Sequence, residues 1–360
     1  MDTLRLKVDP LQLEAPAAVE ALDRAAAILR AGGLVALPTE TVYGLGANAL
    51  DPAAVERIFA AKQRPAWDPV IVHVAPLQRD NPMLLALVEE IPARARRLID
   101  AFWPGPLTLL LPRTRAVPDV VTAGRPLVGV RAPAHPVALT LIRRAGVPVA
   151  APSANLFGHT SPTTVAHVLD DLDGRIDAVL DAGPTEHGVE STVLDPSSTP
   201  MVVYRPGAVT AEQIQEIAGP VQLFRPAACA NPLPQRPMPS PGVSLRHYAP
   251  HARVILVTAP IESLGHELTD AASQLASEQV GVMLPAGIDL PAFAASSTLA
   301  ACSIYPWGQW ADPETMARQL YAGLRALDAA GCTVIVCPVP PDKGIGAAIR
   351  DRLRKAAQPE

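Results

Sequence analysis

Short apolar stretches alternate with helical stretches along the first 218 residues, and this alternation limits the chain to the α/β class. Apolar spacing and end signals predict helices over 17–30, 52–61, 93–102, 136–144, 162–172 and 211–218. Short apolar runs bounded by turn residues predict strands over 34–37, 70–72, 107–111, 127–130, 147–150, 178–180, 192–194 and 202–204. We therefore expect a twisted sheet with helices packed on it.

Prolines divide the chain. Of its 40 prolines, eight fall between residues 219 and 250, where we expect them to break any regular element and to form a stiff linker. Beyond them, predicted strands at 253–257, 280–284 and 333–336 alternate with predicted helices at 261–277, 317–330 and 345–357. This rhythm predicts a smaller α/β sandwich with largely parallel strands. The expected organisation is a first domain over 1–218, a linker over 219–250 and a second domain over 251–360.

Length and composition exclude several classes of protein. A chain of 360 residues favours two domains, and a net charge of -5 argues against sequence-blind binding of nucleic acid. The four cysteines form no C-x-x-C pair and no zinc-ligand spacing. The N-terminus lacks the apolar segment of a signal peptide, and no apolar run is long enough to span a bilayer. We expect a cytoplasmic protein with no membrane contact.

A pair of cations ends the second predicted helix directly before a strand. Lys62 and Arg64 are ordinary at a helix C-terminus, where they complement the helix dipole. They also stand at the edge of an α/β sheet, where ligands usually bind. If the pair binds a ligand, Arg64 clamps a phosphate or carboxylate and Lys62 acts as a point charge.

Other polar groups follow predicted strands in the same way. The stretch from Pro38 to Gly46 is interpreted as a capped, glycine-punctuated turn. Ser161 is predicted to cap a helix whose first residue is Pro162. Further polar residues lie next to other predicted strands, directly before one and after four: His73, Arg131, His135, Ser153, Asn155, Glu190, Ser191 and Arg205. Each has an ordinary structural explanation, but together they predict one polar site.

These blocks occur in a distinctive order: GLVALPTETVYGLGANAL, KQRP, DPVIVH, WPGPLTLLL, VRAPAHP, APSAN, SPT, GVESTV and RPG. In this order they resemble the YrdC-like threonylcarbamoyl-AMP synthases. The segment SPGVSLRHYAP and the ending GIGAAIRDRLRKAA resemble the long, two-domain form of that family. The resemblance implies a YrdC-like catalytic domain on a twisted sheet, followed by a Rossmann-like α/β sandwich.

The resemblance also implies roles for individual residues. The positions at which the family holds threonine are Thr41, His73, Arg131, Ala151 and Ser191, with Ala151 acting through its backbone. The positions at which it binds ATP, the carbamate and the phosphates are Lys62, Arg64, Asp68, Ser153, Asn155, Ser161 and Arg205. Lys62 and Arg64 are the predicted catalytic residues. The lid that the long form folds over its site corresponds to Gly242, Arg246, His247 and Tyr248.

The sequence departs from the family pattern in three places. Asp68 replaces the usual Asn, so an acceptor stands where the family has a donor amide beside a polyanion. The sequence Val-Ser-Leu at 243–245 replaces the more usual Met-Lys-Tyr, and Leu-Phe at 156–157 is bulkier than the small residues often found there. The departures leave the cation pair, His73 and Ser191 intact.

The implied reaction joins L-threonine, bicarbonate and ATP into threonylcarbamoyl-AMP and pyrophosphate, with Mg2+ carried by ATP and no metal ligated by protein side chains. The implied later partner is a separate tRNA threonylcarbamoyl transferase complex, and direct tRNA binding is not indicated. One alternative is a carbamoyltransferase that makes carbamoyl-adenylate from carbamoyl phosphate. Another is a non-catalytic RNA-binding module, although the acidic first domain and the 4% content of aromatic residues count against it.

Overall fold

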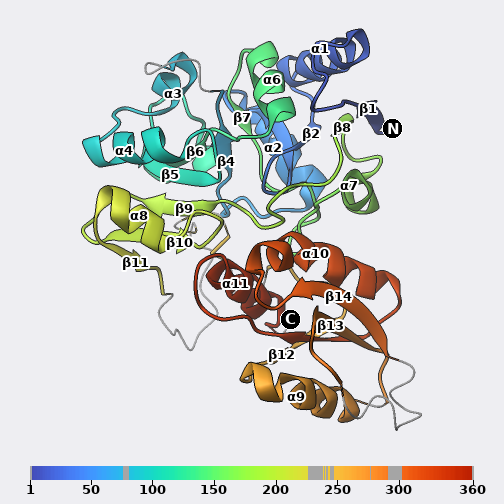
Figure 1. The fold of residues 1–360 in the computed structure, drawn as a ribbon. Coiled ribbons are helices and arrows are strands. Elements are labelled where there is room, and N and C mark those ends of the chain that lie inside the picture. Colours follow the sequence, from blue (N-terminus) through green and yellow to red (C-terminus); the bar gives the residue numbers. More distant parts are fainter. Residues whose placement is uncertain are drawn as a thin grey trace. The chain divides into compact units, whose positions relative to one another are not determined.

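Contacts divide the chain into two compact units. The computed structural model describes residues 2–75, 81–225, 238, 240, 242–243, 247–275, 277–290 and 302–358. The first unit comprises Met1–Phe157, Pro162–Glu186 and Glu190–Val243. The second comprises Gly158–Ser161, His187–Val189 and Ser244–Glu360. Both units are α/β, which confirms the expected fold class (Figure 1).

An eleven-stranded mixed sheet forms the frame of the first unit, in the order β1-β8-β2-β3-β7-β4-β6-β5-β9-β10-β11. Its strands are β1 (Leu4–Lys7), β2 (Val35–Pro38), β3 (Tyr43–Asn48), β4 (Ile71–His73), β5 (Leu107–Pro112), β6 (Leu127–Arg131), β7 (Val149–Ala150), β8 (Ala178–Asp181), β9 (Thr192–Asp195), β10 (Met201–Arg205) and β11 (Val221–Leu223). In the middle, β4 runs parallel to β6, and β5 runs parallel to β9. His73 and Arg131 end β4 and β6, and Ser191 directly precedes β9, so these strands position three residues of the predicted polar site.

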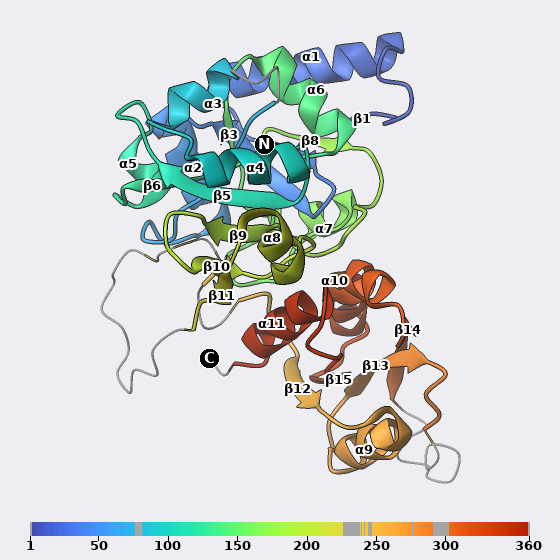
Figure 2. The same ribbon diagram turned by 60° about the vertical axis from the view of Figure 1, so that its left-hand side comes forward.

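Helices bury their apolar faces against this sheet. They are α1 (Pro16–Arg30), α2 (Pro52–Lys62), α3 (Pro82–Leu87), α4 (Ala93–Phe102), α5 (Asp119–Thr122), α6 (Pro136–Ala145), α7 (Val165–Leu172) and α8 (Ala211–Ala218). The bounds of α4 and α8 match the prediction, and α1 packs beside α6 (Figures 1 and 2). A single apolar cluster joins helices and strands from β1 to β11.

The segment predicted as a turn is mostly a strand. The turn covers only 39–42, and Tyr43–Asn48 forms β3, antiparallel to β2. A Cβ atom on Gly46 would lie 2.8 Å from Leu37 Cδ2 and 2.9 Å from Val149 Cγ1. This glycine therefore serves close packing between strands, which the turn interpretation missed.

Two further expectations are corrected. The helix predicted from Pro162 begins at Val165, and Thr164 rather than Ser161 caps it, accepting from the backbone N–H of His167. The prolines after residue 219 do not exclude every regular element, because β11 pairs in parallel with β10. Residues 221–223 lie between prolines but are not prolines themselves, so their N–H groups can take part in the hydrogen bonds of a β-sheet. Much of the expected linker lies outside the described residues, and its boundaries at 219 and 250 stay a prediction.

The second unit is a three-layer sandwich. Its four strands, all parallel, follow the order β12-β15-β13-β14. The elements are β12 (Arg253–Val257), α9 (Ile261–Ser273), β13 (Val280–Ala286), β14 (Ser303–Gln309), α10 (Pro313–Ala329), β15 (Val334–Pro338) and α11 (Gly346–Ala356). Helix α9 lies on one side of the sheet, and α10 and α11 lie on the other (Figures 1 and 2). The expected small parallel sandwich is confirmed, with β14 as an element that the sequence analysis missed.

Trp307 offers a test of this second core. Its fully buried ring lies on β14, and its indole N–H donates to the carbonyl oxygen of Met316 on α10 at 2.8 Å. We expect Trp307→Ala to lower the free energy of unfolding by about 3–5 kcal/mol, because it leaves a large cavity. Chemical denaturation measures the change. Ile304→Ala, on the same strand but 46% exposed, is the matched control. An equal loss in both variants would contradict the packing described.

Candidate functional site

Lys62 is a buried cation at the end of α2. Its side chain is 1% exposed, and Nζ donates to the carbonyl oxygens of Ser153, at 2.6 Å, and of Asn155. The loop that follows β7 thus closes around the ammonium group. Burial holds the pKa of Lys62 well below its usual value, and nearby Arg64 lowers it further, whereas Asp171 and Asp68 oppose the shift. A polyanion placed here would favour the charged form.

Arg64 forms a buried ion pair with Asp68. Arg64 Nη2 lies 2.9 Å from Asp68 Oδ2, and the guanidinium also donates to the carbonyl oxygens of Asp68, at 3.2 Å, and Pro69, at 2.7 Å. Burial raises the pKa of the Asp68 carboxyl, while Arg64, Lys62 and Arg205 oppose the rise. The structure therefore brings three predicted cations around one carboxylate.

Arg205 connects this group to the end of β9. Its Nε donates to the carbonyl oxygen of Ser191 and its Nη2 to Ser191 Oγ, both at 3.0 Å. Ser191 Oγ also lies 2.8 Å from Thr108 Oγ1, a hydroxyl on β5 that the sequence analysis did not select. A Cβ atom on Gly207 would lie 2.4 Å from the backbone nitrogen of Thr192, so this turn needs glycine.

A second group of side chains centres on Arg131 at the end of β6. The guanidinium donates from Nη1 to Thr41 Oγ1 at 3.0 Å and from Nε to the carbonyl oxygen of Gly105 at 3.1 Å. Its Nη2 lies 2.6 Å from Glu40 Oε1. Thr41 and Glu40 belong to the turn between β2 and β3, so a long-range contact joins two separate sequence blocks.

His73 stands beside Arg131, because the two residues are register partners in the parallel pair β4 and β6. Its ring is 3% exposed, and Nδ1 has no hydrogen-bond partner among the described residues. Burial lowers the pKa of His73 to about 3, with a further contribution from the Arg131 charge. The ring is neutral at physiological pH and can accept a hydrogen bond from a ligand ammonium group.

The remaining predicted residues lie in different surroundings. The N–H of Ala151 donates to the carbonyl oxygen of Ile71 at 2.9 Å, so a backbone contact from Ala151 to a ligand would use its carbonyl oxygen. Asn155 Nδ2 donates to the carbonyl oxygen of Leu156 at 2.7 Å. Ser161 is buried, but it belongs to the segment 158–161 of the second unit.

The predicted lid residues are described in part. Gly242 has φ of 77°, as a glycine turn requires, whereas Arg246 lies outside the described residues. Tyr248 is buried, and the guanidinium of Arg352 stacks 5.0 Å from its ring centroid within the second unit. The His247 and Tyr248 rings lie 4.1 Å apart. The lid role of these four residues stays a prediction.

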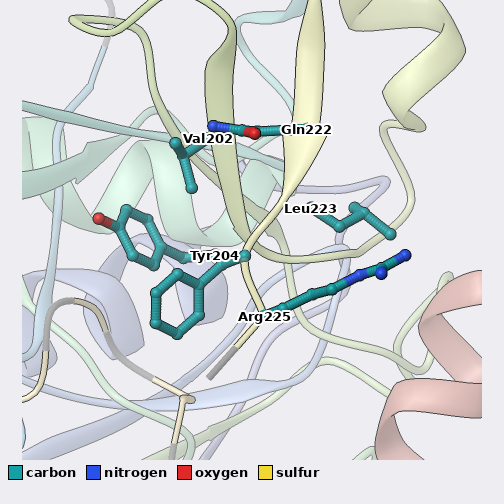
Figure 3. Close-up of a pocket in the computed structure, with 6 residues that line it drawn as sticks. Val202, Tyr204, Gln222, Leu223 and Arg225 are labelled. Atoms are coloured by element: carbon teal, nitrogen blue, oxygen red, sulfur yellow. The ribbon is translucent and has the colours of Figure 1, made fainter. Parts of the chain in front are cut away.

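A pocket of about 670 Å³ lies along β10 and β11 (Figure 3). The sequence analysis selected none of the six residues that line it, which are Val202, Tyr204, Gln222, Leu223, Phe224 and Arg225. The Tyr204 and Phe224 rings lie 4.9 Å apart, and Tyr204 directly precedes Arg205 in the chain. The pocket is mixed in character, with two aromatic rings and one cation.

Polar residues missed by the sequence analysis had weak signals. Glu40 directly follows a buried strand, and Thr108 is a lone hydroxyl in an apolar strand. Among the described residues, no three His, Cys, Asp or Glu side chains are grouped to hold a metal ion. No helix in the described part of the chain is long and apolar enough to cross a membrane. The four buried cations and one neutral imidazole suit the binding of anions and of an amine.

Comparisons with known proteins agree along the whole chain. Residues 27–207 match the family model described as "Telomere recombination", and residues 209–358 match the C-terminal domain of threonylcarbamoyl-AMP synthase. The threonylcarbamoyl-AMP synthase of Pyrococcus abyssi is 42% identical over 92% of this chain and 93% of its own. That of Bacillus subtilis is 43% identical over 93% of this chain and 92% of its own. The crystal structure of Pyrococcus abyssi Sua5 complexed with L-threonine superposes with a TM-score of 0.84, at 38% identity over 99% of this chain and 98% of that one.

The buried imidazole predicts how stability depends on pH. Between pH 6.5 and 3 the unfolded His73 binds a proton that the folded one does not, so stability falls as pH falls. We expect His73→Gln to make this fall shallower by up to about 1.4 kcal/mol per pH unit. Urea denaturation at pH 6.5, 6.0, 5.5 and 5.0 measures the slope. Between pH 7 and 8 the two proteins should show equal slopes. A wild-type slope in the variant below pH 6.5 would show that His73 takes up its proton while folded.

Proposed function

We propose residue roles for a chain that belongs to the threonylcarbamoyl-AMP synthase family. Its activity is the synthesis of threonylcarbamoyl-AMP, which makes it a transferase that draws on ATP. Four buried cations in the first unit, Lys62, Arg64, Arg131 and Arg205, support these roles most directly, because two anionic reactants must be brought together. We infer that the second anion is N-carboxy-threonine, formed from threonine and bicarbonate.

ATP takes the side of the site that holds three cations. Lys62, Arg64 and Arg205 act on the charge of Asp68, and we assign them to the phosphates, together with the polar residues Ser153 and Asn155. The phosphates favour the charged form of Lys62 and so oppose the lowering of its pKa by burial. Asp68 remains paired with Arg64 and orients its guanidinium.

Threonine takes the side that centres on Arg131. The guanidinium suits the substrate carboxylate, and the neutral imidazole of His73 suits the substrate amine. The hydroxyls of Thr41 and Ser191 are assigned to the threonine side chain and backbone. A site built to hydrogen-bond a hydroxyl rejects an amino acid that lacks one. The carbonyl oxygen of Ala151 completes this set.

The reaction then proceeds in two steps. Threonine loses a proton, its amine nitrogen forms a bond to the carbon of bicarbonate, and water leaves. A carbamate oxygen next attacks the α-phosphorus of ATP, and the bond from that phosphorus to the pyrophosphate oxygen breaks. Lys62, Arg64 and Arg205 stabilise the charge that shifts to pyrophosphate, and positioning supplies most of the remaining acceleration.

Mg2+ enters with ATP in this scheme. On the phosphate side Asp68 is already paired with Arg64, so we expect the phosphates rather than protein side chains to hold the ion. We further propose that the reaction takes place in the cytoplasm and that the adenylate passes to a separate tRNA threonylcarbamoyl transferase complex.

Alanine substitutions test the two catalytic assignments. We expect Lys62→Ala and Arg64→Ala each to lower kcat/KM by about 10²–10³-fold, because each removes a preorganised charge from the phosphates. Mass spectrometry detects threonylcarbamoyl-AMP formed from ATP, Mg2+, bicarbonate and threonine, while pyrophosphate release is followed in parallel. The matched control is Lys7→Ala, an exposed lysine on β1.

Omission controls separate this activity from its alternatives. Product must disappear when threonine or bicarbonate is left out. Adenylate formation that requires carbamoyl phosphate instead would indicate the carbamoyltransferase. Full activity of Lys62→Ala and Arg64→Ala would contradict the proposed roles of the pair.

A substitution at Asp68 is expected to strengthen ATP binding rather than to weaken activity. We expect Asp68→Asn to lower the KM for ATP by about tenfold, because it removes a buried negative charge from beside the phosphates. The same change should lower the free energy of unfolding, since Arg64 loses its buried partner. Steady-state kinetics at varied ATP measures the first effect. Asp51→Asn at the other end of α2 is the control, because Asn caps a helix as well as Asp. A raised KM for ATP would show that Asp68 itself assists the nucleotide.

A further inference from the structure

Glu40 is a buried carboxylate with no role in the scheme above. It is 2% exposed and lies in the turn that follows β2. Burial raises the pKa of Glu40, but the charge of its ion-pair partner Arg131 leads the effects that outweigh burial and hold the pKa below its usual value. The carboxylate is therefore charged under working conditions.

Three groups fix the guanidinium of Arg131. Nε donates to Gly105, Nη1 donates to Thr41, and Nη2 is paired with Glu40 at 2.6 Å. A guanidinium carries five N–H groups, so some remain for a ligand carboxylate beyond those directed at Gly105, Thr41 and Glu40. Gly105 and Thr41 are neutral acceptors, and Glu40 is the charged member of the set. Its loss would leave a buried cation without a counter-charge.

The charges of Arg131 and Glu40 also suit a zwitterionic ligand. Arg131 and Glu40 together carry no net charge, and an amino acid at neutral pH is a zwitterion that carries none either. Binding then introduces no net charge into a buried site, which keeps the electrostatic cost of burial low. A site that contained Arg131 without Glu40 would favour simple anions instead.

We propose that Glu40 is a positioning residue for threonine, holding the Arg131 guanidinium in the orientation that receives the substrate carboxylate. This inference rests on the proposed role of Arg131. Glu40 acts through Arg131, so it should affect ligands with a carboxylate far more than ligands without one.

The test compares threonine with threoninamide, which keeps the amine and the hydroxyl but lacks the carboxylate. We expect Glu40→Gln to raise the Kd of threonine by about 10–100-fold, the effect of losing well-aligned hydrogen bonds to a charged group. The Kd of threoninamide should change by less than about threefold, which is smaller than the effect of losing one hydrogen bond to a charged group. Isothermal titration calorimetry measures both, and a non-hydrolysable ATP analogue should bind as tightly as before.

Controls separate this effect from general damage. Asp23→Asn removes a carboxylate from an exposed ion pair with Arg144 and should alter neither ligand. In an Arg131→Gln background, Glu40→Gln should have little further effect on threonine, because coupled residues are not additive. If Glu40→Gln does not fold, Glu40→Asp replaces it in the test. Its side chain is one methylene shorter, so the carboxylate moves away from Arg131, and we expect the same weakening of threonine binding.

Equal weakening of threonine and threoninamide would overturn the proposal, and so would unchanged binding of threonine in a folded variant. If Arg131→Gln weakens threonine while Glu40→Gln does not, the positioning role fails and the proposed function stands. If Arg131→Gln also leaves threonine binding unchanged, both assignments fail.

Discussion

Hydrogen bonds from buried cations to main-chain carbonyl oxygens hold the site of the first unit together. Lys62 donates to the 153–155 loop, Arg64 to residues 68 and 69, Arg131 to Gly105, and Arg205 to Ser191. Removing a cation from water costs several kcal/mol, and these acceptors offset part of that cost. Because each acceptor lies in a loop beside a strand end, the loops and the cations fix each other's positions. Glycines such as Gly207 allow the loops to approach closely enough.

Two carboxylates divide the cations into unequal groups. Asp68 lies among Lys62, Arg64 and Arg205, which leaves an excess of positive charge. Glu40 is paired with Arg131 alone, which leaves none. The proposed ligands differ in the same way, since the phosphates of ATP are strongly anionic and threonine is a zwitterion. Under the proposed roles, the charge balance of each side matches that of its ligand, and such a match would discourage each ligand from binding on the other's side.

The sequence predicted the order of elements well and their close contacts poorly. Helices α4 and α8 were predicted to the residue, because their apolar spacing and end signals are local. Strand β3 was interpreted as a turn, because Gly44 and Gly46 have low strand propensity and their packing partners, Ala151 and Val149, are distant in sequence. Ser161 was assigned the helix cap that Thr164 forms, since both have capping hydroxyls.

The candidate site shows the same contrast between residues that sequence comparison identifies and residues whose partners are distant in sequence. Family resemblance singled out Lys62, Ser153 and Asn155, which the structure brings into contact, although their roles remain proposals. Glu40 and Thr108 escaped notice because their importance lies in long-range partners, Arg131 and Ser191. A side chain whose partner is about 90 residues away has no local pattern that reveals it.

Two short segments, 158–161 and 187–189, belong to the second unit although they are flanked in sequence by the first, and this has a consequence for synthesis on the ribosome. Residues 158–161 pack there, where Ala249 N–H donates to the carbonyl oxygen of Gly158 and Arg325 to that of Thr160. At about 5–20 residues per second, their partners beyond residue 244 emerge several seconds later. The nascent first unit must therefore carry these segments without their partners, and the second unit cannot be completed until both halves of the chain have been made.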